Sequence, residues 1–299
     1  MTRIRQPIPP RNNRAPTQTA REQQRAARQI SEALAVIRSE LLQRFREIDY
    51  TIIVVNDSTY RYRLDEFVLD SLNDYIAELV DQMVMRADSG RPIVSASVEQ
   101  AYQAATAAEI ASVAAQTREF RRTLEETLMS PPYRTRIGLV RARVFEEMRG
   151  FTDQTRTDLA RTLADGMGRG LSPRDIATQI TDRIGVAESR ALRIARTEIN
   201  NAHRRAILDE DEQVNAEGIR TRLLWFSALS PTTRPSHASR HGRIYTKQEV
   251  DDFFSRDGNA INCQCSVRSI LVDESGNPLS DTLPDRLQLQ GAKYFQVAA

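Results

Sequence analysis

The chain has 299 residues, a mass of 33.9 kDa and 40% hydrophobic residues, enough for one large globular domain or two ordinary ones. A mean hydropathy of -0.49, with no run of about 18 apolar residues, argues against a membrane-spanning helix, and the N-terminus lacks the apolar stretch of a secretory signal. Cys263 and Cys265 are the only cysteines, which excludes a disulfide framework and predicts a reducing compartment.

Positive charge is concentrated at the N-terminus. Residues 1–30 carry seven arginines against one acidic residue, Glu22, so they contribute +6 to a net charge of +2 and the rest sums to -4. Four prolines in the same segment predict a disordered basic arm. Arginine suits bidentate phosphate contacts. The whole chain, however, has arginine at all but two of its 42 basic positions, and this bias can equally reflect a GC-rich genome. The arm arginines are Arg3, Arg5, Arg11, Arg14, Arg21, Arg25 and Arg28.

Residues 31–150 are predicted to be helical. Apolar residues recur every three or four positions along residues 30–45 and again along 67–80, the spacing of one buried helix face. Between these stretches, the β-branched run Thr51–Val55 favours an extended segment. No helix breaker lies between residues 92 and 131, which predicts a helix of about 30 residues whose alanine-rich face allows another helix to approach closely. Another helix follows over residues 133–151.

The next segment begins with helices and becomes β-rich. Three glycines at 166, 168 and 170 indicate a turn between helices rather than a phosphate loop, because no strand precedes them and no Gly-Lys-Ser/Thr follows. Ser172 and Pro173 are a typical N-cap and first residue of a helix. A longer helix is expected from Ala187 to about Gln213, and the runs 223–226 and 261–271 favour strands.

The expected fold is therefore mainly α, with a long helical N-terminal half and a small C-terminal α+β domain. Its predicted parts are a basic disordered arm (1–30), a helical domain (31–150), a domain that is helical and then α+β (151–275) and an extended C-terminal tail (276–299).

Two histidines and two cysteines form a candidate zinc site. His237 and His241 lie four residues apart and could share one side of a helical turn, and Cys263 and Cys265 would share one face of a strand. Thiolates with imidazoles are typical zinc ligands. The alternative is that His237 makes buried hydrogen bonds and the cysteines fill a small core. We expect structural zinc to be the only cofactor, if one is bound.

Catalytic patterns are weaker. A zinc protease needs His-Glu-x-x-His, and the run His237-Ala-Ser-Arg-His241 lacks the glutamate. A cysteine hydrolase would pair Cys263 or Cys265 with a histidine base, yet no residue is evident that would orient that base. His203 is predicted to lie on a helix surface. We therefore expect no catalytic residues.

The chain resembles the phage Mu F-like minor head proteins, also called phage head morphogenesis proteins, over roughly residues 155–272. Its first block is Gly168-Arg-Gly-Leu-Ser172 followed by a helix that ends in Ala-Arg-Thr-Glu198. Its second block runs from Trp225 through Arg234-Pro-Ser-His237 to Ile261-Asn-Cys-Gln-Cys265. The motif residues are Arg196, Thr197, Glu198, Trp225, Arg234, His237, Gly242, Asn262, Cys263 and Cys265.

Two positions depart from the family pattern. The family usually has aspartate before the Arg-Pro-Ser-His run and arginine between the two cysteines, where this chain has Ser230-Pro-Thr-Thr and Gln264. We therefore expect no direct role for the aspartate and the arginine that the family usually has at these two positions.

The resemblance implies a minor capsid protein of a tailed bacteriophage, present in few copies. Its expected partners are the portal ring, docked by residues 31–150, packaged double-stranded DNA bound non-specifically by the arm, and scaffold or major capsid protein; no membrane is expected. It would be located in the virion, at the capsid interior or portal vertex, and in the host cytoplasm during assembly.

Two other functions remain open. Mu F-like domains occur beside toxin domains such as nucleases, so the chain could be an enzyme, although no such domain is evident here. A generic nucleic-acid-binding module is the other alternative. Only 6% of the residues are aromatic and no known recognition motif is present, so sequence-specific binding is not expected.

Overall fold

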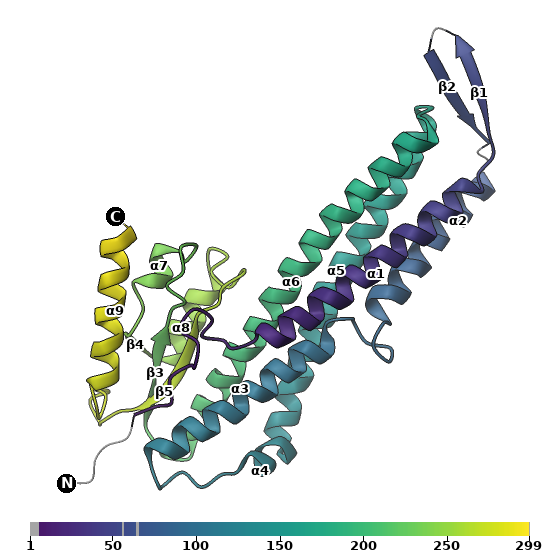
Figure 1. The fold of residues 1–299 in the computed structure, drawn as a ribbon. Coiled ribbons are helices and arrows are strands. Elements are labelled where there is room, and N and C mark those ends of the chain that lie inside the picture. Colours follow the sequence, from purple (N-terminus) through teal and green to yellow (C-terminus); the bar gives the residue numbers. More distant parts are fainter. Residues whose placement is uncertain (1–5, 56, 64–65, 299) are drawn as a thin grey trace. The chain divides into compact units, whose positions relative to one another are not determined.

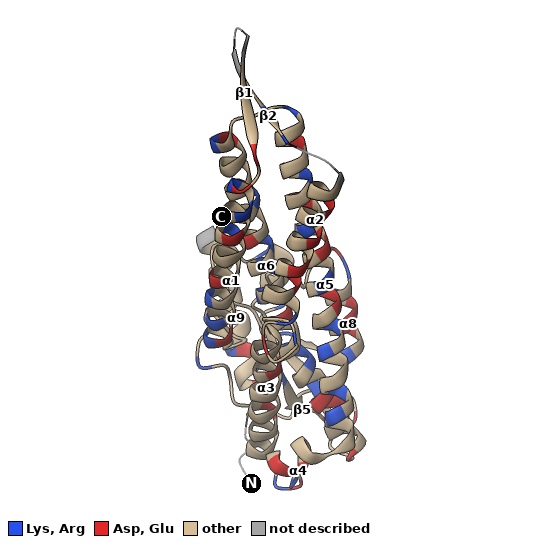
Figure 2. Cartoon of the chain, turned by 90° about the vertical axis from the view of Figure 1, so that its right-hand side faces the viewer, with Lys and Arg blue, Asp and Glu red and all other residues tan. Residues whose placement is uncertain are grey.

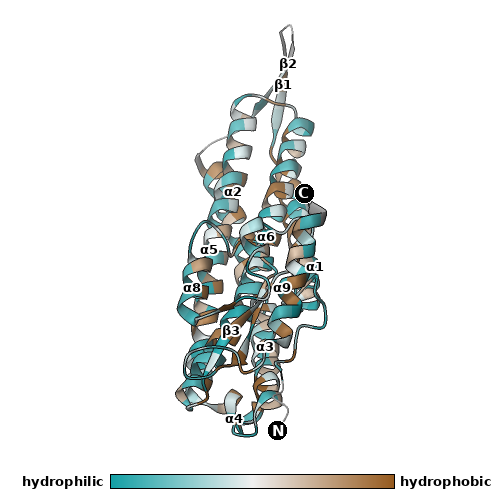
Figure 3. Ribbon diagram, turned by 90° about the vertical axis from the view of Figure 1, so that its left-hand side faces the viewer, coloured by the Kyte–Doolittle hydropathy of each residue, from teal (hydrophilic) through white to brown (hydrophobic). Residues whose placement is uncertain are grey.

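A computed structural model describes residues 6–55, 57–63 and 66–298 and is mainly helical (Figure 1). The helices of this described part are α1 (Ala20–Arg46), α2 (Glu66–Val80), α3 (Ser95–Gln116), α4 (Leu124–Met129), α5 (Pro131–Gly168), α6 (Pro173–Ala216), α7 (Pro235–Ala238), α8 (Lys247–Ser255) and α9 (Thr282–Ala298), and the π-helix η1 (Asp81–Met85) directly follows α2. Figure 3 shows mixed hydrophilic and hydrophobic residues along them. Within the described residues, none of these helices combines the length and the hydropathy of a membrane span.

The chain forms two compact units. The bundle unit comprises Gln24–Ala96 and Arg141–Ala195, and the sheet unit comprises Met1–Gln23, Ser97–Val140 and Arg196–Ala299. The helices α5 and α6 each contribute one part to each unit. The mainly α fold with a C-terminal α+β part is thus confirmed.

In the bundle unit, α1 and α2 lie beside parts of α5 and α6 (Figure 1). The apolar stripe predicted for α1 is buried, and apolar side chains of α5 and α6 are buried as well, which is the pattern of amphipathic helices around a common core. Polar contacts join the helices at the edges: Ser31 of α1 donates to Glu188 of α6, and Tyr75 of α2 donates to Glu40 of α1 at 3.2 Å.

A β-hairpin belongs to the bundle unit. Its strands β1 (Tyr50–Val55) and β2 (Asp57–Tyr62) pair antiparallel, so the predicted extended run is confirmed and the partner strand was not predicted. The backbone N–H of Tyr60 donates to the carbonyl of Gly170 at 3.1 Å. Gly170 has φ +68°, and a Cβ there would lie 2.6 Å from the Thr59 side chain. The predicted turn between helices forms only after Gly168: Gly166 and Gly168 lie within α5, and Gly170 lies in the turn, where the approach of β2 requires glycine.

The sheet unit contains a three-stranded antiparallel sheet in the order β4 (Ile244–Tyr245), β3 (Thr221–Phe226) and β5 (Ser266–Leu271). Nearly every residue of β3 and β5 is buried, so both faces of these strands are covered. On one face, Leu224, Phe226 and Ile270 pack against Leu283 and Leu287 of α9.

Helices α3 and α6 bind the sheet through polar groups. Asp211 of α6 accepts hydrogen bonds from the hydroxyls of Thr221 (2.7 Å) and Ser269 (2.8 Å). Gln116 of α3 donates to the carbonyl of Ser269 at 2.9 Å and accepts from the N–H of Leu271 at 3.2 Å. Because these groups are shielded from water, their pairing fixes both helices on the strands.

The long helix predicted between residues 92 and 131 is wrong in length. α3 ends at Gln116, and α4 begins after a capping box in which Thr123 and Glu126 exchange hydrogen bonds. Between the two helices, Phe120 is buried beside Val113 and Val214. Burial of this aromatic ring and the strong N-cap interrupt the helix without any proline or glycine.

Two terminal predictions are corrected. Residues 20–30, expected to be disordered, form the start of α1, and Thr19 donates to Asn200 at 2.6 Å; residues 1–5 of the predicted arm lie outside the described part. The C-terminal segment, expected to be extended, forms α9. Pro284 lies in the first turn of α9, where a helix tolerates proline because that N–H has no helical partner.

Gly242, one of the motif residues, should tolerate alanine poorly. It has φ +76°, and a Cβ would lie 2.6 Å from the Gln288 backbone nitrogen and 2.8 Å from the Pro284 carbonyl oxygen. We expect Gly242→Ala to lower the free energy of unfolding by about 2 kcal/mol, because strain at positive φ adds to the clash with α9. The control is Gly218→Ala, at φ +89° with open space around it, which should cost about 1 kcal/mol. Equal losses in urea unfolding would contradict the packing argument.

Candidate functional site

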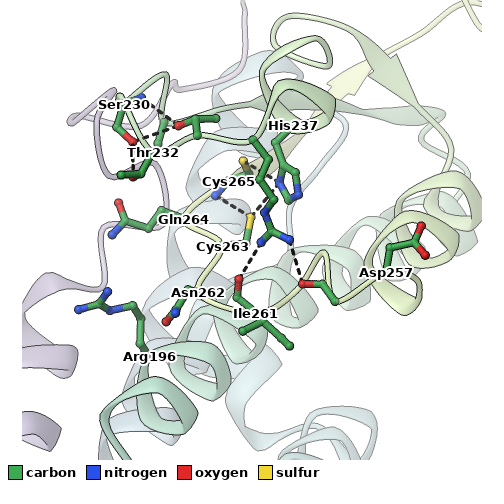
Figure 4. A pocket seen from close by; sticks show the side chains of 14 residues that line it. Arg196, Ser230, Thr232, His237, Asp257, Ile261, Asn262, Cys263, Gln264 and Cys265 are labelled. Carbon is green, nitrogen blue, oxygen red and sulfur yellow. Dashed lines mark hydrogen bonds between the residues drawn. The ribbon is translucent and has the colours of Figure 1, made fainter. Parts of the chain in front are cut away.

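The residues of the second motif block come together in the sheet unit. They lie at the end of β3, on α7 and on the loop before β5, next to α6. His237, Cys263 and Cys265 have donor atoms within 4.8 Å of one another, and all three residues are buried. The Nδ1 atom of His237 lies 3.3 Å from the Cys263 sulfur and 3.6 Å from the Cys265 sulfur. Figure 4 shows these side chains pointing toward one another.

Hydrogen bonds fix the ring of His237. Its Nε2 atom lies 3.2 Å from the side-chain oxygen of Asn259, whose own amide group donates to the Phe253 carbonyl at 2.9 Å. Because the amide NH2 group of Asn259 bonds the Phe253 carbonyl, the amide oxygen of Asn259 is the atom that faces His237. The Nε2–H group of His237 therefore donates to that oxygen. In the neutral ring, Nδ1 therefore presents a lone pair to the two sulfurs.

The cysteine loop is held by α6. The carbonyl of Cys263 accepts from the side chains of Asn200 (2.9 Å) and Arg204 (3.0 Å), and the N–H of Asn262 donates to Thr197 at 3.1 Å. Asn262 has φ +54°, a left-handed conformation that a strand does not allow. The strand predicted from Ile261 is therefore wrong before Ser266, where β5 begins.

The two sulfurs also contact nearby polar groups. The N–H of Cys265 donates to the Cys263 sulfur, and the Ser227 hydroxyl lies 3.3 Å from the Cys265 sulfur. Contact with Cys265 lowers the pKa of the Cys263 thiol well below its ordinary value, and contact with Cys263 together with burial raises the pKa of Cys265 well above it. The pair thus favours one thiolate and one thiol.

Arg234 holds the same loop through hydrogen bonds to its backbone. Its guanidinium donates to the carbonyls of Gly258 (3.0 Å), Asn259 (3.2 Å) and Ile261 (2.7 Å). Three bonds from one rigid group fix the backbone between Asn259 and the cysteines. This motif residue is therefore structural.

The remaining motif residues support the loop or face solvent. Trp225 is fully buried, and Glu198 is buried and accepts from Asn201 at 3.2 Å. Arg196 is exposed and lines a pocket of about 790 Å³. The pocket reaches His237 and both cysteines, whereas Figure 4 shows Arg196 and Gln264 pointing away from the sulfurs.

His241, predicted as the fourth ligand, lies outside the cluster. α7 ends at Ala238, so the two histidines do not share a helix face. The Nδ1 atom of His241 accepts from the N–H of Ser227 at 2.9 Å, and its Nε2 atom lies 3.5 Å from Gln290. Burial lowers the pKa of His241, which keeps the ring neutral at pH 7.

The prediction that His203 lies on a helix surface is wrong. It is buried, its Nε2 atom lies 3.0 Å from the Ser266 hydroxyl, and burial lowers its pKa well below 6.5. Its position beside Ala202 and Ala206, on the helical spacing of a buried face, was the signal that could have shown this. Nothing in the sequence indicated Asn259.

The predicted arm arginines fall into three groups. Arg3 and Arg5 lie outside the described residues, and Arg25 is half-buried. The exposed members are Arg11, Arg14, Arg21 and Arg28. Figure 2 shows basic and acidic residues interspersed over the helices.

The sheet unit is an α+β unit with a buried Cys-x-Cys and histidine cluster. Residues 157–268 match the family model of the phage Mu protein F like proteins, which confirms the resemblance and supports a phage head morphogenesis protein at the family level. The family suggests a structural role.

One curated relative gives a partial match. A protein of Haemophilus influenzae described as "Uncharacterized protein" is 25% identical over 136 residues, which are 46% of this chain. The match spans only 30% of the length of that relative. No solved structure matches the chain.

Proposed function

We propose that the chain is a minor head protein of a tailed bacteriophage that binds the portal vertex and packaged DNA during head morphogenesis. The observation that carries the proposal is the match of residues 157–268 to the Mu F-like family, over a region that contains the whole histidine and cysteine cluster. The proposed location is the capsid interior or portal vertex.

Exposed apolar side chains support portal docking by residues 31–150. Phe67, Ile52 and Tyr50 are 81%, 55% and 47% exposed in the bundle unit, and large exposed apolar side chains are typical of protein interfaces. Their partner in this proposal is the helical portal ring encoded in the same genome.

Portal binding is tested by mixing the two purified proteins and measuring co-elution and mass by size-exclusion chromatography with light scattering. We expect a complex of defined stoichiometry that Phe67→Ser weakens by about tenfold, because truncating one anchor at an interface costs at least about 1–2 kcal/mol. Leu289→Ser, at an equally exposed leucine (65%) of α9 outside residues 31–150, is the control. No complex with the portal at micromolar concentration in low and moderate salt would contradict portal docking and favour scaffold or major capsid protein as the partner.

The exposed arginines of the arm support non-specific DNA binding. Replacing Arg11, Arg14 and Arg21 with glutamine should lower the slope of log affinity against log salt by about 0.9 for each phosphate that the variant no longer neutralises. Substitution is the cleaner change, since deletion of residues 1–28 would also remove Ala26, which is buried in α1. Filter binding to double-stranded DNA over a salt series measures the slope.

The matched control for the arm replaces three exposed arginines elsewhere with glutamine, at Arg161, Arg183 and Arg193. If both triple variants lose the same affinity, the arm has no special role and only net charge matters.

A further inference from the structure

We propose that His237, Cys263 and Cys265 together bind one zinc ion, with the fourth coordination position facing the adjoining pocket. The three donor atoms converge from two segments of the chain, α7 and the loop before β5, and all three residues are buried. The proposal therefore replaces the four-ligand set expected from the sequence with a Cys₂His set.

The spacing of the donors fits zinc. Zinc–sulfur bonds of about 2.3 Å and zinc–nitrogen bonds of about 2.0–2.1 Å at a tetrahedral angle place sulfur and nitrogen about 3.6 Å apart. The Nδ1 atom of His237 lies 3.3 and 3.6 Å from the two sulfurs. One ion can therefore contact all three donors with only small side-chain shifts.

The surroundings of His237 match those of a metal ligand. A ligating histidine usually donates its other ring N–H to an oxygen, which fixes the tautomer and the ring orientation. Asn259 supplies that oxygen at Nε2, and the Phe253 carbonyl fixes Asn259 in turn. The lone pair of Nδ1 is thus directed at the two sulfurs.

The sulfurs are likewise supported. The N–H of Cys265 donates to the Cys263 sulfur at 3.3 Å, a bond that stabilises negative charge on a thiolate. Both sulfurs would bind the ion as thiolates, so any proton still on a thiol is released to solvent when zinc binds.

The fourth position is reached through the pocket of about 790 Å³, which all three donor residues line. His241 cannot fill it, because its Nδ1 atom accepts from Ser227 and the ring lies beside Gln290. Water from the pocket is the simplest fourth ligand. The ion would join α7 to the loop before β5, segments that are about 26 residues apart in the chain.

A competing arrangement uses the same residues. Cys263, His237 and Asn259 could act as nucleophile, base and orienting amide of a cysteine hydrolase. The second sulfur favours zinc: Cys265 lies almost as close to Nδ1 as Cys263 does, and a hydrolase has no use for it. Both sulfurs are also shielded from solvent, with Cys263 only 5% exposed.

The test uses the full chain purified without chelator, and zinc is measured by plasma mass spectrometry and by titration against a competing chelator. We expect one equivalent in the wild type and in the control His241→Gln, which changes a buried histidine outside the cluster. Cys263→Ser, Cys265→Ser and His237→Gln should each weaken zinc binding by more than about tenfold.

Cobalt substitution of the wild-type chain gives a readout that needs no variant to fold. We expect the thiolate-to-cobalt charge-transfer band and the intense visible bands of a tetrahedral site. A folded wild-type chain that takes up neither zinc nor cobalt would overturn the proposal. Rapid and selective alkylation of Cys263 in that metal-free protein, abolished in His237→Gln, would instead support the hydrolase arrangement.

Discussion

Replacing Trp225 with alanine is expected to lower the free energy of unfolding by about 3–5 kcal/mol, the usual range for truncating a fully buried tryptophan. Its ring stacks on Phe254 with centroids 5.1 Å apart and meets Phe253 edge-on at 5.3 Å. Phe253 also contacts the His237 ring and accepts the hydrogen bond from Asn259. The truncation should therefore loosen the ligand cluster as well as the core.

Trp225→Phe should cost much less, about 1–2 kcal/mol, because the volume removed is smaller and the indole N–H has no hydrogen-bond partner among the described residues. Phe67→Ala, at a side chain that is 81% exposed, should change stability by no more than about 0.5 kcal/mol. Urea unfolding measures all three variants. A loss below about 1 kcal/mol for Trp225→Ala would mean that the aromatic cluster can collapse around the cavity.

The second large effect concerns Glu109, which is fully buried on α3. Its carboxylate accepts from the N–H of Ser269 at 2.7 Å and lies 3.7 Å from the guanidinium of Arg268. Burial raises the pKa of Glu109 from 4.5 to about 7, Arg268 and Ser269 offset part of that rise, and Asp211 adds to it. The carboxyl group is therefore harder to ionise in the folded chain than in the unfolded one.

The sign of the pH effect follows from this raised pKa. Between pH 4.5 and about 7 the unfolded chain releases the Glu109 proton and the folded chain retains it, so stability falls as pH rises and levels off above pH 7. The fall amounts to about 3 kcal/mol, since one pKa unit corresponds to about 1.4 kcal/mol.

Glu109→Gln isolates this contribution, because glutamine keeps the shape and the acceptor oxygen without titrating. The stability difference between wild type and variant should change by about 3 kcal/mol between about pH 4.5 and 7.5, in favour of the variant at the higher pH. Arg268→Met removes the nearest cation and should extend the fall beyond pH 7. Thermal unfolding across this pH range measures both, and a difference that does not vary with pH would show that Glu109 ionises normally.

Local sequence patterns predicted the buried face of one helix and the start of another. The apolar stripe from Ile30 to Phe45 is the buried face of α1. The Ser172 hydroxyl caps α6 by accepting from the N–H of Asp175 at 3.1 Å. Such signals depend on neighbours within one or two turns, so a single stretch of sequence contains them.

Features that depend on distant residues were not predictable. Phe120 ends α3 by joining a cluster with Val214, and α9 is stabilised by strands that precede it in the chain. Glu109 meets Arg268 across 159 positions. Three of the four candidate ligands do come together, but the end of α7 at Ala238 removes His241 from the set, and the spacing of the histidines could not show where that helix ends.

The most direct test of the proposed function is to purify heads assembled from the genome that encodes this chain and to quantify their proteins by mass spectrometry. We expect the chain in every preparation of heads, at a few copies per portal ring and in a constant ratio to the portal protein. Heads that contain the portal protein but lack this chain at all stages of assembly would contradict its role as a minor head protein.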